Sequence, residues 1–409
     1  MDDRSQAISG EPMTQPLAGI RVADFSHVMA GPFASHLLRL MGAEVIKIEP
    51  KTGDNFRNYG GDRRYDGMAP AFIAANAGKK SIALDLKDPA DLDVARAIVE
   101  RSDVLLENFR PGVIARLGLG YDAARALNPE IVFCSVSGYG QVGPQRDWPA
   151  IDNIVQATSG MMMLSGAEGD APVRIGFPIV DTLTGQTAAL AIVSALLRRA
   201  NGGGGSYIDV SMLDASLAFM TSALTPFLVT GKPMPRMGNT GYSGLPTASM
   251  YLARNGRRIS LGVVQQSQFV ALAGWLERQD WLDDPRFATP QARRENFDVM
   301  RQQLADELAK YDAEDLESGM SAKGIPCGLV RSVDEGAALA GPDALLPLTI
   351  PGLPDGETLA IPNAGFRMSE NGPGTTCAPP RLDENREEIL AWLRNDRDPS
   401  NGGTKHRKV

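Results

Sequence analysis

The sequence predicts an α/β protein: a Rossmann-like large domain with a parallel sheet, followed by a smaller α+β domain. Up to residue 136, short β-rich runs alternate with single helical segments, which is the pattern of parallel strands joined by helical crossovers. The 409 residues exceed the roughly 100–200 residues of one typical domain. A stretch rich in Gly and Pro at residues 231–244 then predicts a domain boundary.

The first half contains five expected strands, with a sixth after a glycine-rich turn. They are residues 19–25, 44–49, 80–86, 103–108, 131–136 and 207–210. A helix is expected at 31–42, with Pro32 near its start and Gly42 at its end, and another at 89–101, where Asp88 can cap the first turn. Further helices are expected between 151 and 200 and at 214–228. The apolar run at 181–197 is shorter than a membrane span, so it predicts a buried helix.

The second half predicts a small domain inserted before the chain returns to the large one. Residues 248–263 form an expected hairpin that turns at Asn255-Gly256, and helices are expected at 267–277 and 291–311. The chain is therefore divided into a flexible N-terminus (1–16), a large domain (17–231), a small α+β domain (232–325), a return segment (326–397) and a disordered tail (398–409). The return segment ends in a helix expected at 379–397.

Composition excludes several classes of partner. With 41 basic and 49 acidic residues the net charge is −8, which argues against nucleic acid or an anionic membrane as a partner, because both need a basic face. Three distant cysteines indicate neither a disulfide framework nor a zinc site and favour a cytoplasmic location. Histidine is also scarce, which disfavours catalysis by a Ser-His-Asp or Cys-His arrangement and a His-rich metal site.

Two features near the ends of expected strands could contact a ligand, and each could instead have a purely structural role. The spacing of Gly138, Gly140 and Gly143 matches a dinucleotide fingerprint, but Pro144 follows and no amphipathic helix begins there, so a nicotinamide or flavin site is disfavoured. His27 ends the first strand, where ligands of parallel sheets bind.

Two further features carry polar side chains that could serve either structure or chemistry. Asp152 opens the run DNIVQATSG, where it could cap a helix or act as a catalytic carboxylate. Asn108, Phe109 and Arg110 follow the fourth strand and could form a plain turn or a loop that contacts a ligand.

Six collinear motifs resemble one family over nearly the whole chain. They are 16–49 (PLAGIRVADFSHVMAGPFASHLLRLMGAEVIKIE), Gly53-Asp54 with Arg57, 79–87 (KKSIALDLK), 103–118 (DVLLENFRPGVIARLG), 135–144 (SVSGYGQVGP) and 152–160 (DNIVQATSG), with 324–330 (GIPCGLV) as a further match. Together they resemble the class III CoA-transferases, which include formyl-CoA and carnitine CoA-transferases and the α-methylacyl-CoA racemases.

The resemblance implies an interlocked homodimer that acts on an acyl-CoA and a small organic acid. Coenzyme A would be a substrate, with no tightly bound cofactor and no metal. Asp152 stands in the place of the catalytic aspartate. A carboxylate needs no general base, and its attack on a thioester would give an aspartyl anhydride and then an aspartyl-CoA thioester. Succinyl-CoA is a plausible donor.

The resemblance also implies the residues around the two substrates. CoA would lie near the strand ends, with the phosphates near Arg116 and Lys87. The residues expected near CoA are His27, Met29, Ala30, Leu84, Asp85, Leu86, Lys87, Asn108, Phe109, Arg110, Arg116, Ser137, Gly138, Tyr139 and Gly140. Those expected near the organic acid are Arg57, Tyr59, Gly241 and Gly244.

Departures from the family pattern bear on the reaction. Met29 replaces a glutamine and Ser137 a lysine of formyl-CoA transferase, which argues against formyl and oxalate specificity. Ile151 replaces the histidine that precedes the racemase aspartate, and racemisation needs a proton donor and an acceptor. A CoA-transferase is therefore favoured over a 2-methylacyl-CoA racemase, a non-catalytic CoA-binding protein and a dehydrogenase.

Overall fold

The computed structural model describes residues 15–60, 65, 67–350 and 358–395, so the expected terminal segments lie almost wholly outside the described residues. The chain forms two compact units. Unit 1 contains residues up to Ser159, from Ile175 to Leu224, and from Gly341 onward; unit 2 contains Gly160–Arg174 and Thr225–Ala340. Residues 160–174, placed in the large domain by the sequence, are held in unit 2, where Gly166 accepts a hydrogen bond from the Gly238 amide at 3.0 Å.

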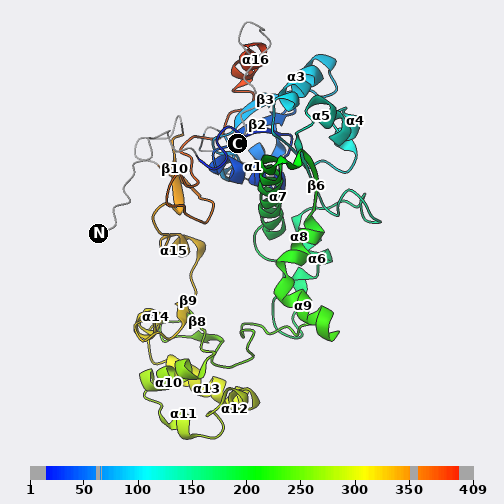
Figure 1. Cartoon of the computed structure of the whole chain (residues 1–409). Coiled ribbons are helices and arrows are strands. Elements are labelled where there is room, and N and C mark those ends of the chain that lie inside the picture. The colour runs from blue at the N-terminus through cyan, green and yellow to red at the C-terminus, as the bar shows by residue number, and fades with distance from the viewer. Residues whose placement is uncertain (1–14, 61–64, 66, 351–357, 396–409) are drawn as a thin grey trace, which may run out of the picture. The chain divides into compact units, whose positions relative to one another are not determined.

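A six-stranded parallel sheet forms the centre of unit 1, which confirms the predicted α/β class (Figure 1). Its strands are β1 (Arg21–Asp24), β2 (Glu44–Glu49), β3 (Lys80–Ala83), β4 (Val104–Glu107), β5 (Val132–Ser137) and β6 (Ser206–Ser211). Their order is β3-β2-β1-β4-β5-β6, and every adjacent pair is parallel. Strand order therefore reverses between β1 and β4, where doubly wound sheets bind their ligands.

Helices cover both faces of this sheet, because successive strand residues point to opposite sides. Val22, Val104 and Val132 pack in one core with α1 (Ala30–Leu40) and α7 (Ile179–Arg198). Ala23, Leu105 and Phe133 pack in another. That second core contains side chains of α3 (Pro89–Glu100), α5 (Tyr121–Leu127) and α16 (Arg386–Asn395).

Shorter elements complete unit 1. They are η1 (Asn55–Asn58), α2 (Pro70–Asn76), α4 (Val113–Arg116), α6 (Asp152–Thr158), the π-helical turn η3 (Arg199–Gly203), α8 (Met212–Phe219) and the antiparallel pair β10 (Leu345–Leu348) and β11 (Leu359–Pro362). The helix expected at 214–228 is instead α8 and α9 (Thr221–Thr230), which meet at a bend of 79°. The helix expected at 379–397 begins only at Arg386, after the two prolines at 379 and 380.

Unit 2 has its own three-stranded antiparallel sheet and its own core. Strands β7 (Met250–Leu252) and β8 (Arg258–Leu261) form the predicted hairpin, and β9 (Cys327–Leu329) pairs with β8. The start of the expected return segment thus lies in this sheet. The helices of unit 2 are η2 (Met161–Met163), α10 (Gln266–Trp275), α11 (Asp280–Asp283), α12 (Pro290–Glu295), α13 (Phe297–Leu308), α14 (Ala313–Ser321) and α15 (Val333–Ala337). The helix expected at 291–311 is therefore broken at Asn296.

Among the described residues, one helix is long and apolar enough to cross a bilayer, at residues 179–203, and the bent pair α8–α9 passes the same test when joined. Half of the apolar window of the first helix is buried inside the protein. It packs against α1, β5 and β6, as the sequence predicted for a buried helix. These contacts identify it as a core helix of unit 1.

Buried ion pairs fix the turns that follow β1 and β2. Lys47 donates to the Asp54 carboxylate at 3.0 Å and to the Ser26 carbonyl at 2.8 Å. Lys79 pairs with Asp24 at 3.1 Å. Burial opposes ionisation of both aspartates, but the lysine charges hold the pKa of Asp24 and of Asp54 below the ordinary value. The two turns are therefore tied to each other through charged groups that water does not reach.

The close contact of α1 with α7 depends on Gly185. A Cβ atom at Gly185 would lie 2.7 Å from the Ala30 carbonyl oxygen, which is backbone and cannot swing away. We expect Gly185→Ala to lower the free energy of unfolding by about 1–3 kcal/mol because the helices must separate. Gly274→Ala is the matched helical control, since a Cβ there meets nothing within 4 Å. This substitution should raise the free energy of unfolding by about 0.5–1 kcal/mol, because alanine favours the helix over glycine. Calorimetric unfolding measures both; equal effects would contradict the packing argument.

Removing the ammonium group of Lys47 should be far more costly than removing a surface charge. We expect Lys47→Met to lower the free energy of unfolding by about 3–5 kcal/mol, since Asp54 would be left charged and buried without its partner. Lys80→Met is the control: Lys80 pairs with Glu44 and Glu388 while one-third exposed, so its loss should cost less than about 1 kcal/mol. Similar costs in denaturant titrations would contradict the expectation that burial makes the loss of Lys47 the more destabilising of the two.

Candidate active site

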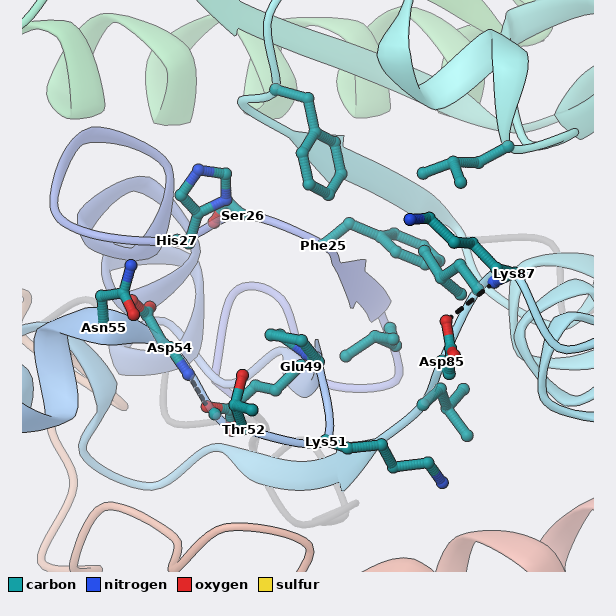
Figure 2. Close-up of a pocket in the computed structure, with 17 residues that line it drawn as sticks. Phe25, Ser26, His27, Glu49, Lys51, Thr52, Asp54, Asn55, Asp85 and Lys87 are labelled. Atoms are coloured by element: carbon teal, nitrogen blue, oxygen red, sulfur yellow. Dashed lines mark hydrogen bonds between the residues drawn. The ribbon is translucent and has the colours of Figure 1, made fainter.

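A cavity of about 530 Å³ lies at the carboxyl ends of β1 to β4. Its walls are residues 25–27 after β1, 48–55 at the end of β2 and beyond, 84–87 after β3, and Phe109 and Leu117 beyond β4. Figure 2 shows His27 and Asn55 on one side of this cavity and Asp85 and Lys87 on the other. The cavity thus adjoins the position where strand order reverses.

Several residues expected near CoA meet in these walls. They are His27, Leu84, Asp85, Leu86, Lys87 and Phe109. The strand expected at 80–86 ends at Ala83, so the next residues leave the sheet and can line the cavity. Lys87 is exposed and forms no ion pair with any described residue, which leaves its ammonium group available to an anion.

Asn108 and Phe109 hold His27 in place. Asn108 accepts a hydrogen bond from the His27 amide at 2.9 Å and donates one to the His27 carbonyl at 2.8 Å. The rings of Phe109 and His27 are 5.2 Å apart. Burial lowers the pKa of His27, so its imidazole is neutral at neutral pH and adds no fixed charge to the wall.

Val28 has a strained backbone beside this wall. Its φ of 66° lies in the left-handed region, which β-branched residues rarely occupy. The Val28 amide donates to both carboxylate oxygens of Asp54, at 3.2 and 3.1 Å. The Lys47–Asp54 pair therefore holds the strained turn that leads into α1. Met29 and Ala30, both expected near CoA, follow in this turn and lie outside the cavity walls.

Other expected CoA residues also lie outside the cavity walls. Ser137, Gly138, Tyr139 and Gly140 are at the end of β5, where a Cβ at Gly138 would lie 2.1 Å from that of Ala150. The remaining ones are Asn108, Arg110 and Arg116, in the segment between β4 and the end of α4.

The residues expected near the organic acid are divided between the two units. Arg57 is buried, with its guanidinium donating to Glu49 at 2.6 and 2.8 Å and to the Pro380 carbonyl at 2.9 Å. Tyr59 is exposed in unit 1, whereas Gly241 and Gly244 belong to unit 2. These hydrogen bonds give Arg57 a structural role in unit 1.

Asp152 lies in the first turn of α6, and its carboxylate caps another helix. Ile151 occupies the N-cap position of α6, so Asp152 does not fill the capping role considered for it there. Its Oδ2 accepts hydrogen bonds from the amides of Val180 and Asp181, at 2.7 and 3.2 Å, in the first turn of α7. Its Oδ1 accepts one from Gln156 Nε2 at 2.7 Å. Three donors therefore fix the Asp152 carboxylate.

Asp181 is a second carboxylate at the same helix terminus, and the sequence did not single it out. Burial and then the charge of Asp152 raise the pKa of Asp181 to about 7. Its side chain accepts no hydrogen bond from any described residue. An acidic residue in the first turn of a long apolar helix was visible in the sequence, but its proximity to Asp152, 29 positions earlier, was not.

This pair combines a fixed carboxylate with a free one, both in unit 1. In its ionised form the free one can attack an electrophilic carbonyl. The first-turn amides of α7 donate to Asp152, so they stabilise the charge of that residue. For metal chemistry the described residues offer no group of three or more His, Cys, Asp or Glu side chains placed to hold an ion.

Comparisons with known proteins agree with this architecture. A model of CoA-transferase family III matches residues 17–386. The succinate–glutarate CoA-transferase of Agrobacterium fabrum is 36% identical over 331 residues, covering 78% of this chain and 81% of that protein. The succinyl-CoA–D-citramalate CoA-transferase of Chloroflexus aurantiacus is 33% identical over 389 residues, covering 94% and 96%. The crystal structure of a CAIB/BAIF family protein from Brucella suis has a TM-score of 0.83 at 28% identity, covering 93% of this chain and all of that one. The chain therefore belongs to CoA-transferase family III.

Proposed function

We propose that this protein transfers CoA from an acyl-CoA donor to a small carboxylic acid through a covalent aspartyl intermediate. The observation that carries the proposal is the pair of carboxylates at the start of α7. Asp152 is fixed by three hydrogen bonds, whereas the Asp181 side chain accepts none from the residues that the structure describes. The cavity at the strand ends supplies walls for CoA in the same unit. Free CoA and its thioesters are the substrates in this scheme.

The geometry favours Asp181 over Asp152 as the attacking residue. The resemblance placed Asp152 in that position, but its lone pairs accept hydrogen bonds from two backbone amides and one side-chain amide. An attacking oxygen must release such bonds, whereas Asp181 has none to break. Asp152 then acts as a positioning residue that orients the first turn of α7 and with it Asp181.

The chemical steps follow from a carboxylate nucleophile. The aspartate oxygen attacks the thioester carbonyl, the C–S bond breaks, and an aspartyl anhydride and CoA thiolate result. The thiolate then attacks the aspartyl carbonyl, which releases the donor acid and leaves an aspartyl-CoA thioester. The acceptor carboxylate attacks the carbonyl of this thioester, the C–S bond breaks, and a second anhydride and CoA thiolate result. The thiolate then attacks the acceptor's acyl carbonyl, which forms the new acyl-CoA and releases the aspartate as a free carboxylate.

The cavity suits CoA in charge and polarity. The exposed ammonium group of Lys87 can meet a phosphate, and Phe25, Leu84 and Phe109 offer apolar surface to uncharged parts of the ligand. Arg110 and Arg116, together with Ser137–Gly140, remain part of the proposed CoA surface. Because two relatives are named for succinate or succinyl-CoA, we propose succinyl-CoA as the donor.

We further propose that two chains form an interlocked homodimer in the cytoplasm. Apolar side chains stand exposed on the described helices of unit 1: Leu190 and Leu197 on α7 are 69% and 63% exposed, and Phe219 on α8 is 59% exposed. Exposed apolar surface of this kind is typical of an interface between proteins.

Substitution of each carboxylate should separate attack from positioning. We expect Asp181→Asn to lower turnover by roughly 10³-fold or more, since the attacking oxygen is lost. Asp152→Asn should lower it by about 10²-fold because Asp181 is misplaced. Incubation with succinyl-CoA, borohydride or hydroxylamine trapping and peptide mass spectrometry should map the adduct to Asp181.

The control for this experiment is Asp214→Asn, which removes an exposed acid of α8 and should leave turnover unchanged. An adduct on Asp152 would return the attacking role to that residue. Full turnover in both Asp152→Asn and Asp181→Asn would overturn the covalent scheme.

The homodimer is tested by mass in solution. Light scattering coupled to size-exclusion chromatography should give about twice the chain mass of 43.7 kDa. Leu190→Asp should reduce the dimer fraction because a charge would be buried in the interface. A monomer of the unmodified protein at micromolar concentration would contradict the proposal.

A further inference from the structure

Glu107 is a buried acid without a cation. It is the last residue of β4 and is 2% exposed. Three other buried acids of unit 1, Asp24, Glu49 and Asp54, each pair with a lysine or arginine at 3.1 Å or less. Glu107 forms no ion pair with any residue that the structure describes, and no cation contributes to the shift of its pKa. Its charge would therefore be buried without compensation.

The groups around Glu107 are neutral or acidic. Across the sheet its register partner is Ser135 on β5, whose own partner is Asp209 on β6. Tyr207 of β6 donates to the Ser135 hydroxyl at 3.5 Å, and Cys134 of β5 is fully buried. Burial and the charge of Asp209 raise the pKa of Glu107 to about 7, although hydrogen bonds from Ser135 and the Phe109 amide act in the opposite direction.

Glu107 holds the turn that forms one wall of the cavity. Its Oε2 accepts a hydrogen bond from the Phe109 amide at 2.8 Å. Phe109 lines the cavity and packs against His27, which Asn108 fixes through two hydrogen bonds. The Glu107 carboxylate and this wall of the cavity are therefore linked directly through that hydrogen bond.

We propose that Glu107 is a positioning residue that keeps the Asn108–Phe109 wall closed while it carries a proton, so that proton loss weakens ligand binding in the cavity. The identity of the ligand rests on the proposed function, which makes it CoA. When Glu107 ionises, an unpaired buried charge favours the conformation in which the wall opens and the carboxylate is hydrated. The closed wall binds ligand, so ligand binding and proton binding favour each other.

The test compares the dissociation constant of CoA for the unmodified protein and for Glu107→Gln by calorimetry at pH 6 and pH 8.5. Glutamine keeps an acceptor for the Phe109 amide but cannot ionise. Any titration of CoA itself is common to both proteins. We expect the unmodified protein to lose about 3- to 10-fold more affinity between these pH values than Glu107→Gln does. Equal pH dependence in the two proteins would overturn the inference.

Asp209→Asn gives a second readout that a merely structural role would not change. Removing the neighbouring charge should move the midpoint of the affinity loss to lower pH, because Glu107 would ionise more easily. Glu130→Gln is the matched control: it removes an exposed acid at the opposite end of the sheet and should leave the midpoint unchanged. A midpoint unaffected by Asp209→Asn would count against Glu107 as the titrating group.

A ligand-free measurement separates this inference from the proposed function. The folded state favours protonated Glu107, so its stability should fall between the ordinary carboxyl pKa of 4.5 and about 7, and Glu107→Gln should abolish that part of the fall. If neither protein binds CoA but the stability difference is present, the proposed function is wrong, while the conclusion that Glu107 is protonated in the folded state is supported. If CoA binds and neither difference is seen, the proposed function stands and the inference fails.

Discussion

The turns at the carboxyl ends of β1 and β2 depend on two buried ion pairs, Lys47–Asp54 and Lys79–Asp24. A buried ion pair gains little over an apolar pair in total stability, but losing one partner is costly. The lysines therefore act mainly as constraints on geometry. The charge of Lys47 keeps Asp54 ionised, and Asp54 accepts hydrogen bonds from the Val28 amide. These bonds hold a β-branched residue at a φ of 66°. The cavity walls therefore start from turns that buried ion pairs and hydrogen bonds hold.

The second constraint lies at the N-terminus of α7, where the carboxylates of Asp152 and Asp181 meet. Its first amides need acceptors, and α6 supplies one in Asp152 rather than a residue next to α7 in sequence. This arrangement brings two carboxylates together. Burial and the charge of Asp152 both disfavour ionisation of Asp181, and its pKa is therefore raised. Asp181 and Glu107 thus resemble each other electrostatically. Asp181 is half-buried and Glu107 is buried, and neither forms an ion pair with a residue that the structure describes. They differ in position, because Asp181 begins a helix and Glu107 ends a strand beneath the cavity wall.

The regular elements were predicted well where local periodicity suffices. Residues 44–49 form β2 with the expected bounds, although the strand carries two buried charged side chains, Lys47 and Glu49. The Asn255-Gly256 turn joins β7 and β8 as expected. Predictions failed where tertiary contacts override propensity: residues 84–86 leave the sheet to line the cavity, and residues 291–311 divide into two helices at Asn296. Residues 160–174 join unit 2 through pairing with the segment around Met237, a contact that no local pattern reveals.

The α/β class, most strands and helices, and the family resemblance follow from the order of residues alone, because these depend on short-range periodicity and on collinear motifs. What the polar residues of those motifs do depends on contacts between distant parts of the chain. Within the described part of the chain, Arg57 pairs with Glu49, Asp152 caps α7, Asp181 accepts no side-chain hydrogen bond, and Glu107 pairs with no cation. The physical reason is that charge, burial and hydrogen bonding at one residue are set by neighbours from other elements, whose proximity a linear sequence does not contain.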